Sequence, residues 1–247
     1  MQTTPDFDSF AASYATGSPV LVWTSLVSDL ETPVSAMLKL ADGRPNSFLF
    51  ESVEGGATRG RYSFIGLKPD LIWRCFGNRA EINRRVRSDP DAFVAHRGTA
   101  PGALESLRAI IAECRVATPE PLPPMAAGLF GYMGYGMVGL MEKLPDSKPD
   151  TLGIPDGLFV RPTIVCVFDN IADRVTAITP VWPDCGLSAE AAYERARERL
   201  ADVVGDLERN LPHRREAADA VQELPAPKPN MTREQCLRMV EAGKDYI

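Results

Sequence analysis

The stretch FLFESVEGGATRGRYSFIG, residues Phe48–Gly66, says most about the fold and the function of this chain. Its first half is an apolar run that ends on Glu51 and Ser52. A pair of glycines follows, and glycine tolerates the positive φ angles that tight turns require. The chain then returns through Arg59 and Arg61 toward a second apolar run. The pattern predicts two strands joined by a turn, with polar side chains clustered near that turn.

Similar patterns on both sides of this stretch predict further hairpins. Residues 70–84, DLIWRCFGNRAEINR, predict a hairpin that turns at Gly77-Asn78. Residues 156–181 predict two long strands joined at 170–173. Capping residues and apolar periodicity predict helices over residues 4–17, 32–41, 102–114, 188–211 and 232–247. Because hairpins dominate and regular βαβ alternation is missing, we expect an α+β fold with mainly antiparallel sheet and flanking helices.

The composition limits the class of protein. With 247 residues, a hydrophobic content of 45% and a net charge of −6, the chain is typical of a globular protein. A nucleic-acid partner is not expected, because phosphate binding usually requires a basic face. The five cysteines are scattered without a CxxC pair, which favours reduced thiols in a cytoplasmic protein. We expect no signal peptide and no membrane segment, since no apolar run approaches the ~18 residues of a span.

No catalytic or metal-binding constellation is expected in this chain. Its glycines lack the GxxxxGK[ST] and GxGxxG spacings of phosphate-binding loops, and no GxSxG elbow occurs. His96 and His213 lie in charged stretches without a second ligand at metal-binding spacing. The glycine-rich segment 128–140, GLFGYMGYGMVGL, suits a ligand-facing loop. The same segment also suits a core helix or strand that packs closely through its small residues, and we favour this second interpretation. Tyr132 and Met133 are then expected among the core side chains.

The polar residues of the Phe48–Gly66 stretch allow two interpretations. Glu51 and nearby carbonyls can hold an ammonium group, while Ser52 and the guanidinium of Arg59 or Arg61 can hold a carboxylate. The cluster therefore suits a zwitterionic ligand such as an amino acid. The same side chains can equally form exposed ion pairs across a hairpin.

Several segments resemble one family. FLFESVEGGATRGRYSFIG is similar to the LLES…GRYSxIG hallmark of anthranilate synthase component I, a chorismate-utilising enzyme. The resemblance continues in DLETPVSAMLKLADGRPNSF, LKPDLIWRC, GLFGYMGYGMVGLMEKLP, IVCVFDNIADRVTAI and CLRMVEAGKDYI. It extends from Pro19 to Ile247, with departures at Met37, Phe50 and Gly136, where Tyr, Leu and Asp are common in the family.

The resemblance implies a lyase. Family members eliminate pyruvate from chorismate with Mg²⁺, and they use ammonia from a glutamine amidotransferase subunit, component II, to make anthranilate for tryptophan biosynthesis. Tryptophan inhibits them through a site around the serine that matches Ser52. By the same resemblance, Glu51, Pro33, Val34 and Arg61 contribute to the tryptophan site on this chain.

The resemblance also implies that this chain is the N-terminal part of a two-half fold. We expect a regulatory domain over residues 1–224, a linker over 225–230 and the truncated start of the chorismate-binding domain over 231–247. The residues that bind chorismate and Mg²⁺ then belong to the other half, so the chain alone is expected to be inactive and to hold no catalytic or metal-binding residue. Two alternatives stay open: component I of aminodeoxychorismate synthase, and a freestanding amino-acid-binding module.

Overall fold

The computed structural model describes residues 1–54, 58–123, 125–144, 150–183, 186–211 and 226–246. The chain divides into two units, Met1–Pro212 and His213–Ile247, and each is described by itself. In the second unit, Thr232 and Gln235 exchange hydrogen bonds at the start of helix α5 (Arg233–Asp245). This reciprocal pair confirms the predicted capping box.

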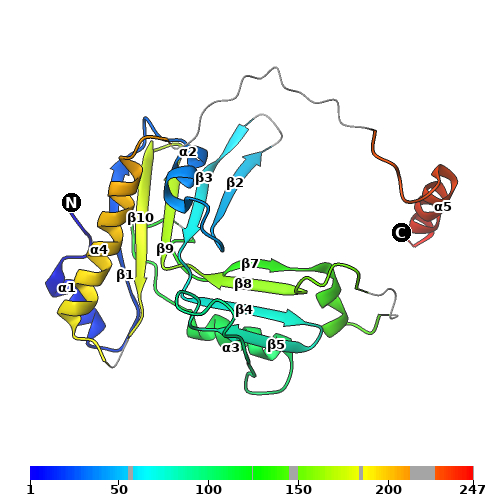
Figure 1. The fold of residues 1–247 in the computed structure, drawn as a ribbon, viewed down its shortest axis with the longest axis horizontal. Coiled ribbons are helices and arrows are strands. Elements are labelled where there is room, and N and C mark those ends of the chain that lie inside the picture. Colours follow the sequence, from blue (N-terminus) through cyan, green and yellow to red (C-terminus); the bar gives the residue numbers. More distant parts are fainter. Residues whose placement is uncertain (55–57, 124, 145–149, 184–185, 212–225, 247) are drawn as a thin grey trace. The chain divides into compact units, whose positions relative to one another are not determined.

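The first unit is built on two five-stranded sheets, in which every neighbouring pair of strands is antiparallel (Figure 1). The first sheet runs in the order β1 (Val20–Val27), β10 (Arg174–Val181), β9 (Ile164–Asp169), β3 (Thr58–Leu67) and β2 (Phe48–Glu54). The second runs β6 (Val94–Ala95), β5 (Arg79–Asn83), β4 (Leu71–Phe76), β8 (Gly157–Arg161) and β7 (Phe130–Met133). The helices are α1 (Phe7–Tyr14), α2 (Pro33–Ala41), α3 (Ala103–Glu113), the 3₁₀ helix η1 (Tyr135–Leu140) and α4 (Ala189–Leu207). The predicted α+β class, with mainly antiparallel sheet and flanking helices, is confirmed.

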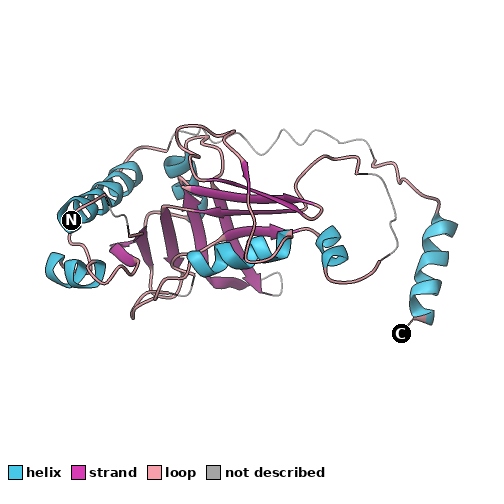
Figure 2. Ribbon diagram, turned by 90° about the horizontal axis from the view of Figure 1, so that it is seen from below, coloured by secondary structure: helices cyan, strands magenta, loops and turns pink. Residues whose placement is uncertain are grey.

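The elements of this unit form four layers: helices, sheet, sheet and helix (Figure 2). Helices α1, α2 and α4 cover the outer face of the first sheet, and their side chains share one apolar cluster with it. The inner faces of the two sheets share a second cluster, which contains Trp23, Phe64 and Phe130. Helix α3 covers the outer face of the second sheet, where Trp73 is fully buried. Alternate residues of the central strands therefore belong to different cores.

Strand β9 shows this arrangement in its sequence, IVCVF. Ile164, Cys166 and Phe168 face the helices, whereas Val165 and Val167 face the second sheet. Both faces are buried, so the strand is a continuous apolar run and not an alternating one. Complete burial raises the pKa of the Cys166 thiol to about 12, which makes this cysteine an unreactive core residue.

One expectation about the strands is wrong: residues 157–169 do not form a single long strand. Pro162 offers no N–H to a sheet ladder, and here the chain passes from β8 of the second sheet to β9 of the first. The chain also changes sheets between β3 and β4. Thr163 ties the two crossings together, because its Oγ1 donates to the carbonyl of Lys68 at 2.7 Å.

Two side chains predicted in the core are also exposed. Tyr132 and Met133 of β7 are 41% and 46% exposed. Strand β7 is the last strand of the second sheet and pairs only with β8 among the described strands. An edge strand is covered less completely than a central one, so apolar character alone did not predict the burial of these residues.

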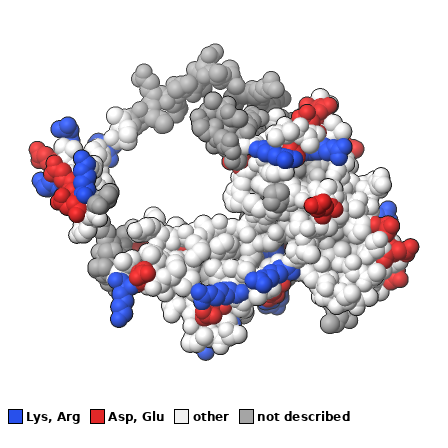
Figure 3. Space-filling view, turned by 180° about the vertical axis from the view of Figure 1, so that it is seen from behind, with Lys and Arg blue, Asp and Glu red and all other residues white. Residues whose placement is uncertain are grey.

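The surface of the described residues carries charges of both signs. On the face seen in Figure 3, Lys and Arg side chains stand in small groups, as do Asp and Glu side chains, between uncharged areas. Among the described residues, every helix is too short or too polar to span a lipid bilayer.

Helix α2 begins with the predicted cap-then-proline signal. The Ser35 N–H donates to Oγ1 of Thr32 at 3.1 Å, the Thr32 N–H donates to Oγ of Ser35 at 2.9 Å, and Pro33 occupies the first turn. We expect Thr32→Ala to lower the free energy of unfolding by about 1 kcal/mol, because it leaves a helix N–H without its acceptor. Thr99→Ala, at an exposed threonine, is the matched control. Urea unfolding measures both variants, and equal midpoints would contradict the role of the cap.

Candidate functional site

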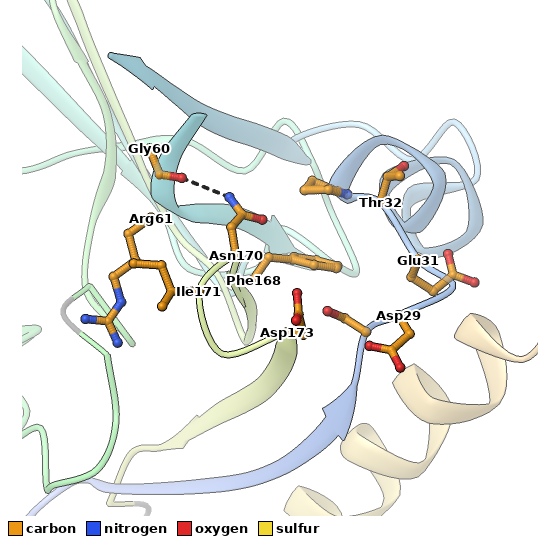
Figure 4. A pocket seen from close by; sticks show the side chains of 11 residues that line it. Asp29, Glu31, Thr32, Gly60, Arg61, Phe168, Asn170, Ile171 and Asp173 are labelled. Atoms are coloured by element: carbon orange, nitrogen blue, oxygen red, sulfur yellow. Dashed lines mark hydrogen bonds between the residues drawn. The ribbon is translucent and has the colours of Figure 1, made fainter. Parts of the chain in front are cut away.

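A cavity of about 560 Å³ opens at the end of the first sheet, beside the N-terminus of α2 (Figure 4). Three parts of the chain that are distant in sequence form it: the residues between β1 and α2, the start of β3, and the turn between β9 and β10. The lining residues are Ser28, Asp29, Glu31, Thr32, Pro33, Gly60, Arg61, Phe168, Asn170, Ile171 and Asp173.

The β9–β10 turn is fixed to the neighbouring strand by hydrogen bonds. Nδ2 of Asn170 donates to the carbonyl of Gly60 at 2.9 Å, and the Asn170 N–H donates to the carbonyl of Arg61 at 2.8 Å. The turn residue Asp173 adopts a left-handed conformation with φ 49°, and its carbonyl accepts from the Ser28 N–H at 3.0 Å. These bonds hold β1, β3 and the turn together around the cavity.

Arg61 is held by a carboxylate at the rim of the cavity. Its Nη2 lies 2.8 Å from Oδ2 of Asp169, and its Nε lies 3.2 Å from both carboxylate oxygens. The guanidinium also lies 4.8 Å from the ring centre of Tyr62. Hydrogen bonding to Arg61 lowers the pKa of Asp169, and the same bond raises the pKa of Arg61. Both groups therefore stay charged at neutral pH, and the Nη1 hydrogens of Arg61 are left for another acceptor.

The opposite side of the cavity is acidic. Glu31 has structural partners, because it accepts from Oγ of Ser35 at 2.7 Å and forms an ion pair with Lys39. Asp29 and Asp173 are exposed, and neither forms an ion pair with a described residue. Figure 4 shows these two aspartates on one side of the cavity and the guanidinium of Arg61 pointing away from them. The described lining of this cavity therefore has an acidic edge, while the guanidinium of Arg61 lies toward the neighbouring pocket with Asp169 and Tyr62.

Two of the five residues of the predicted tryptophan site line this cavity. Pro33 is buried and lines it together with Arg61, whereas Val34 is 51% exposed and does not line it. Glu51 is exposed on β2, which packs with β3 against α2. The backbone of Ser52 lies in β2, and its side chain is outside what the structure describes. The structure therefore brings Pro33 and Arg61 together, and the complete set stays a prediction.

A bulge brings Ser52 close to Arg61 in strand register. Glu51 pairs with Ser63 and Val53 pairs with Arg59, so Ser52 alone on β2 stands opposite residues 60–62 of β3. Bulges redirect the side chains next to them and are common beside functional sites. The backbone positions of Ser52 and Arg61 thus lie at an irregular point of the ladder.

Sequence reasoning missed the acidic residues of the site and the partner of Arg61. Asp169 follows Arg61 by 108 positions, and no local pattern connects them. A weak signal was present in the segment DNIAD, residues 169–173, because Asp and Asn directly after an apolar strand are typical of turns. That signal predicts the turn, but it does not predict which strand the turn contacts.

The fold and the cavity define an α+β protein with a polar pocket at one sheet end. No model of a protein family matches the chain. Curated proteins named anthranilate synthase component 1 do match it. The one from Cereibacter sphaeroides is 47% identical over 98% of this chain and 47% of its own length. The one from Pseudomonas aeruginosa is 37% identical over 90% of this chain and 44% of its own length. The one from Synechocystis is 31% identical over 98% of this chain and 48% of its own length.

The chain belongs to the anthranilate synthase component I family, and it spans about half the length of the curated relatives it matches. The resemblance stated from the sequence is confirmed. A crystal structure of anthranilate synthase component I from Streptococcus pneumoniae is similar with a TM-score of 0.48, at 20% identity, over 90% of this chain and 44% of that one.

Proposed function

We propose that this chain is the N-terminal, regulatory part of an anthranilate synthase component I, which converts chorismate and ammonia to anthranilate and pyruvate in tryptophan biosynthesis. The observation that carries the proposal is the 47% identity to the Cereibacter sphaeroides protein of that name along 98% of this chain. The half of the relatives that this chain does not match then supplies the residues that bind chorismate.

Tryptophan is the proposed effector of the cavity beside α2. Its ammonium group would face the acidic side formed by Asp29 and Asp173. Glu51, on strand β2, stays a proposed member of the site by family resemblance. The tryptophan carboxylate would meet Ser52 and the free Nη1 of Arg61, because charge-assisted hydrogen bonds to a guanidinium are strong and directional. Pro33 supplies an apolar wall. Val34, the next residue of α2, does not line the cavity and stays a proposed member of the site by family resemblance alone.

Mg²⁺ and ammonia would act in the part of the enzyme that this chain does not match. Among the described residues, no group of three or more His, Cys, Asp or Glu side chains is placed to hold a metal ion. We therefore assign no step to Mg²⁺ on this chain. Ammonia would come from a glutamine amidotransferase subunit, component II. Three buried free cysteines, Cys75, Cys114 and Cys166, support a cytoplasmic location, where thiols stay reduced.

The first test is activity. We expect the chain alone, given chorismate, Mg²⁺ and ammonium, to produce no anthranilate fluorescence above a control without protein. The polypeptide that joins the chain to a chorismate-binding half should produce it. Anthranilate made by the chain alone would overturn the proposed division of roles.

The same assay separates the two alternatives. If the joined polypeptide forms aminodeoxychorismate in place of anthranilate, as resolved by chromatography, component I of aminodeoxychorismate synthase is the better description. If the natural polypeptide has no chorismate-binding half and still binds tryptophan in calorimetry, the chain is a freestanding amino-acid-binding module.

A further inference from the structure

A second cavity, of about 470 Å³, lies at the other end of β10, between that strand, α4 and the crossing that leads into β4. It is separate from the cavity beside α2: residues 173 and 181, at the two ends of β10, are about 25 Å apart at the usual rise of a strand. Its lining residues are Asp70, Arg161, Pro180, Val181, Trp182, Pro183, Leu187, Ala192, Arg195 and Arg199. Three of these are arginines and one is an aspartate.

Both carboxylate oxygens of Asp70 accept hydrogen bonds from Arg161. Its Nε and Nη2 donate to the two carboxylate oxygens of Asp70 at 2.7 and 3.1 Å. The Arg161 side chain is only 11% exposed, and its guanidinium lies 4.5 Å from the ring centre of Trp182. Nη1 of Arg161 also lies 3.5 Å from Oε1 of Glu113, which pairs with Arg84. The two arginines and two carboxylates form a neutral network, of which Arg161 and Asp70 line one wall of the cavity.

The other two arginines have no such partner. Within the described residues, neither Arg195 nor Arg199 forms an ion pair, and Arg199 donates only a long hydrogen bond of 3.3 Å to Oγ1 of Thr179. Burial lowers the pKa of Arg199, and the nearby positive charges of Arg87 and Arg195 lower it further, while Asp70 opposes them. The cavity therefore gathers positive charge that the described residues do not neutralise.

We propose that this cavity binds a small dianionic oxyanion, a phosphate group or a pair of carboxylates, held by Arg195 and Arg199. Arg199 would supply its guanidinium fork from inside the cavity, and Arg195, one helical turn before it on α4, would close the ligand from the solvent side. The paired Arg161 and Asp70 would position the ligand without changing its net charge. Nothing in the proposed enzymatic function requires this site, so the two proposals stand independently.

The test is calorimetry on the purified protein, with inorganic phosphate and malonate as separate probes at matched ionic strength. We expect saturable binding of at least one probe. Arg199→Gln should weaken it about tenfold or more, since one charge-assisted hydrogen bond is lost. Arg195→Gln, at an exposed position, tests the same site if Arg199→Gln does not fold. Phosphate binding without malonate binding would identify a phosphate-bearing ligand, and the reverse a dicarboxylate.

Arg197→Gln is the matched control. Arg197 lies on the same helix, is paired with Glu194 at 2.9 Å, and does not line the cavity. This variant changes the protein charge equally, so its affinity should stay within about twofold of wild type, because distant exposed charges are screened. If neither probe saturates, or if Arg197→Gln weakens binding as much as Arg195→Gln, the proposed site does not exist.

Discussion

In the polypeptide that joins this chain to a chorismate-binding half, Ser52→Phe is expected to weaken tryptophan inhibition roughly 10- to 150-fold, with chorismate turnover nearly unchanged. A hydrogen bond to a charged group contributes about 1.5–3 kcal/mol, and each 1.4 kcal/mol corresponds to a factor of ten in affinity. A phenyl ring would also occupy space that the ligand needs, which adds to the loss. The prediction rests on the proposed function.

The position of Ser52 explains why the effect should be confined to the effector. It lies at the bulge opposite residues 60–62, on an edge strand of the first sheet, and not within a buried core strand. Inhibition at a second site reaches the chemistry only through a coupling free energy between the two sites. Removing the effector contact should therefore leave the chorismate site intact.

Steady-state assays over a tryptophan series measure this prediction. Ser13→Phe, at an exposed serine of α1, controls for the added aromatic surface and should keep the wild-type inhibition constant. An unchanged inhibition constant for Ser52→Phe would remove Ser52 from the site. Equal losses of inhibition and turnover would indicate misfolding, which circular dichroism would detect.

The local parts of the fold were predictable because they depend on residues close in sequence. Thr32-Pro33 begins α2, and Thr232 with Gln235 begins α5, because each cap is a contact over three residues. The turn at Gly77-Asn78 joins β4 to β5 for the same reason, since glycine there has φ 53°. In these cases the residues that form the sequence pattern also make the contact that stabilises the structure.

The tertiary parts were not predictable from such patterns. Pro162 lies where the chain passes from the second sheet to the first, and this change of sheet depends on strand pairing far along the sequence. The order of the first sheet places β9 between β3 and β10, so the Arg61–Asp169 pair joins segments that no periodicity relates. The exposure of Tyr132 depends on β7 being an edge strand, which is a property of the whole sheet. The sequence therefore predicted Pro33 and Arg61 of the cavity lining and missed its acidic side, while Glu51 and Ser52 of β2 stay predictions.

The glycine-rich segment supplies the second large effect, because one of its glycines is required by packing. Gly131 of β7 pairs with Phe159 of β8. A Cβ atom at Gly131 would overlap the carbonyl oxygen of Leu158 and lie 2.8 Å from Cα of Phe159. These are backbone atoms of a paired strand, so no side-chain rotation relieves the contact. This favours the interpretation of the segment as a tightly packed strand.

We expect Gly131→Ala to lower the free energy of unfolding by about 3 kcal/mol, at the upper end for overpacking. Relief requires β7 to move away from β8, which also loosens Phe130, whose ring lies 5.0 Å from that of Phe48 and which is only 4% exposed. Gly139→Ala is the matched control: a Cβ there meets no atom within 4 Å, so its change should stay within about 0.5 kcal/mol. Urea unfolding followed by circular dichroism gives both midpoints and both slopes. If the two variants unfold at the same urea concentration with the wild-type slope, β7 can shift at little cost, and the close approach at Gly131 does not constrain the fold.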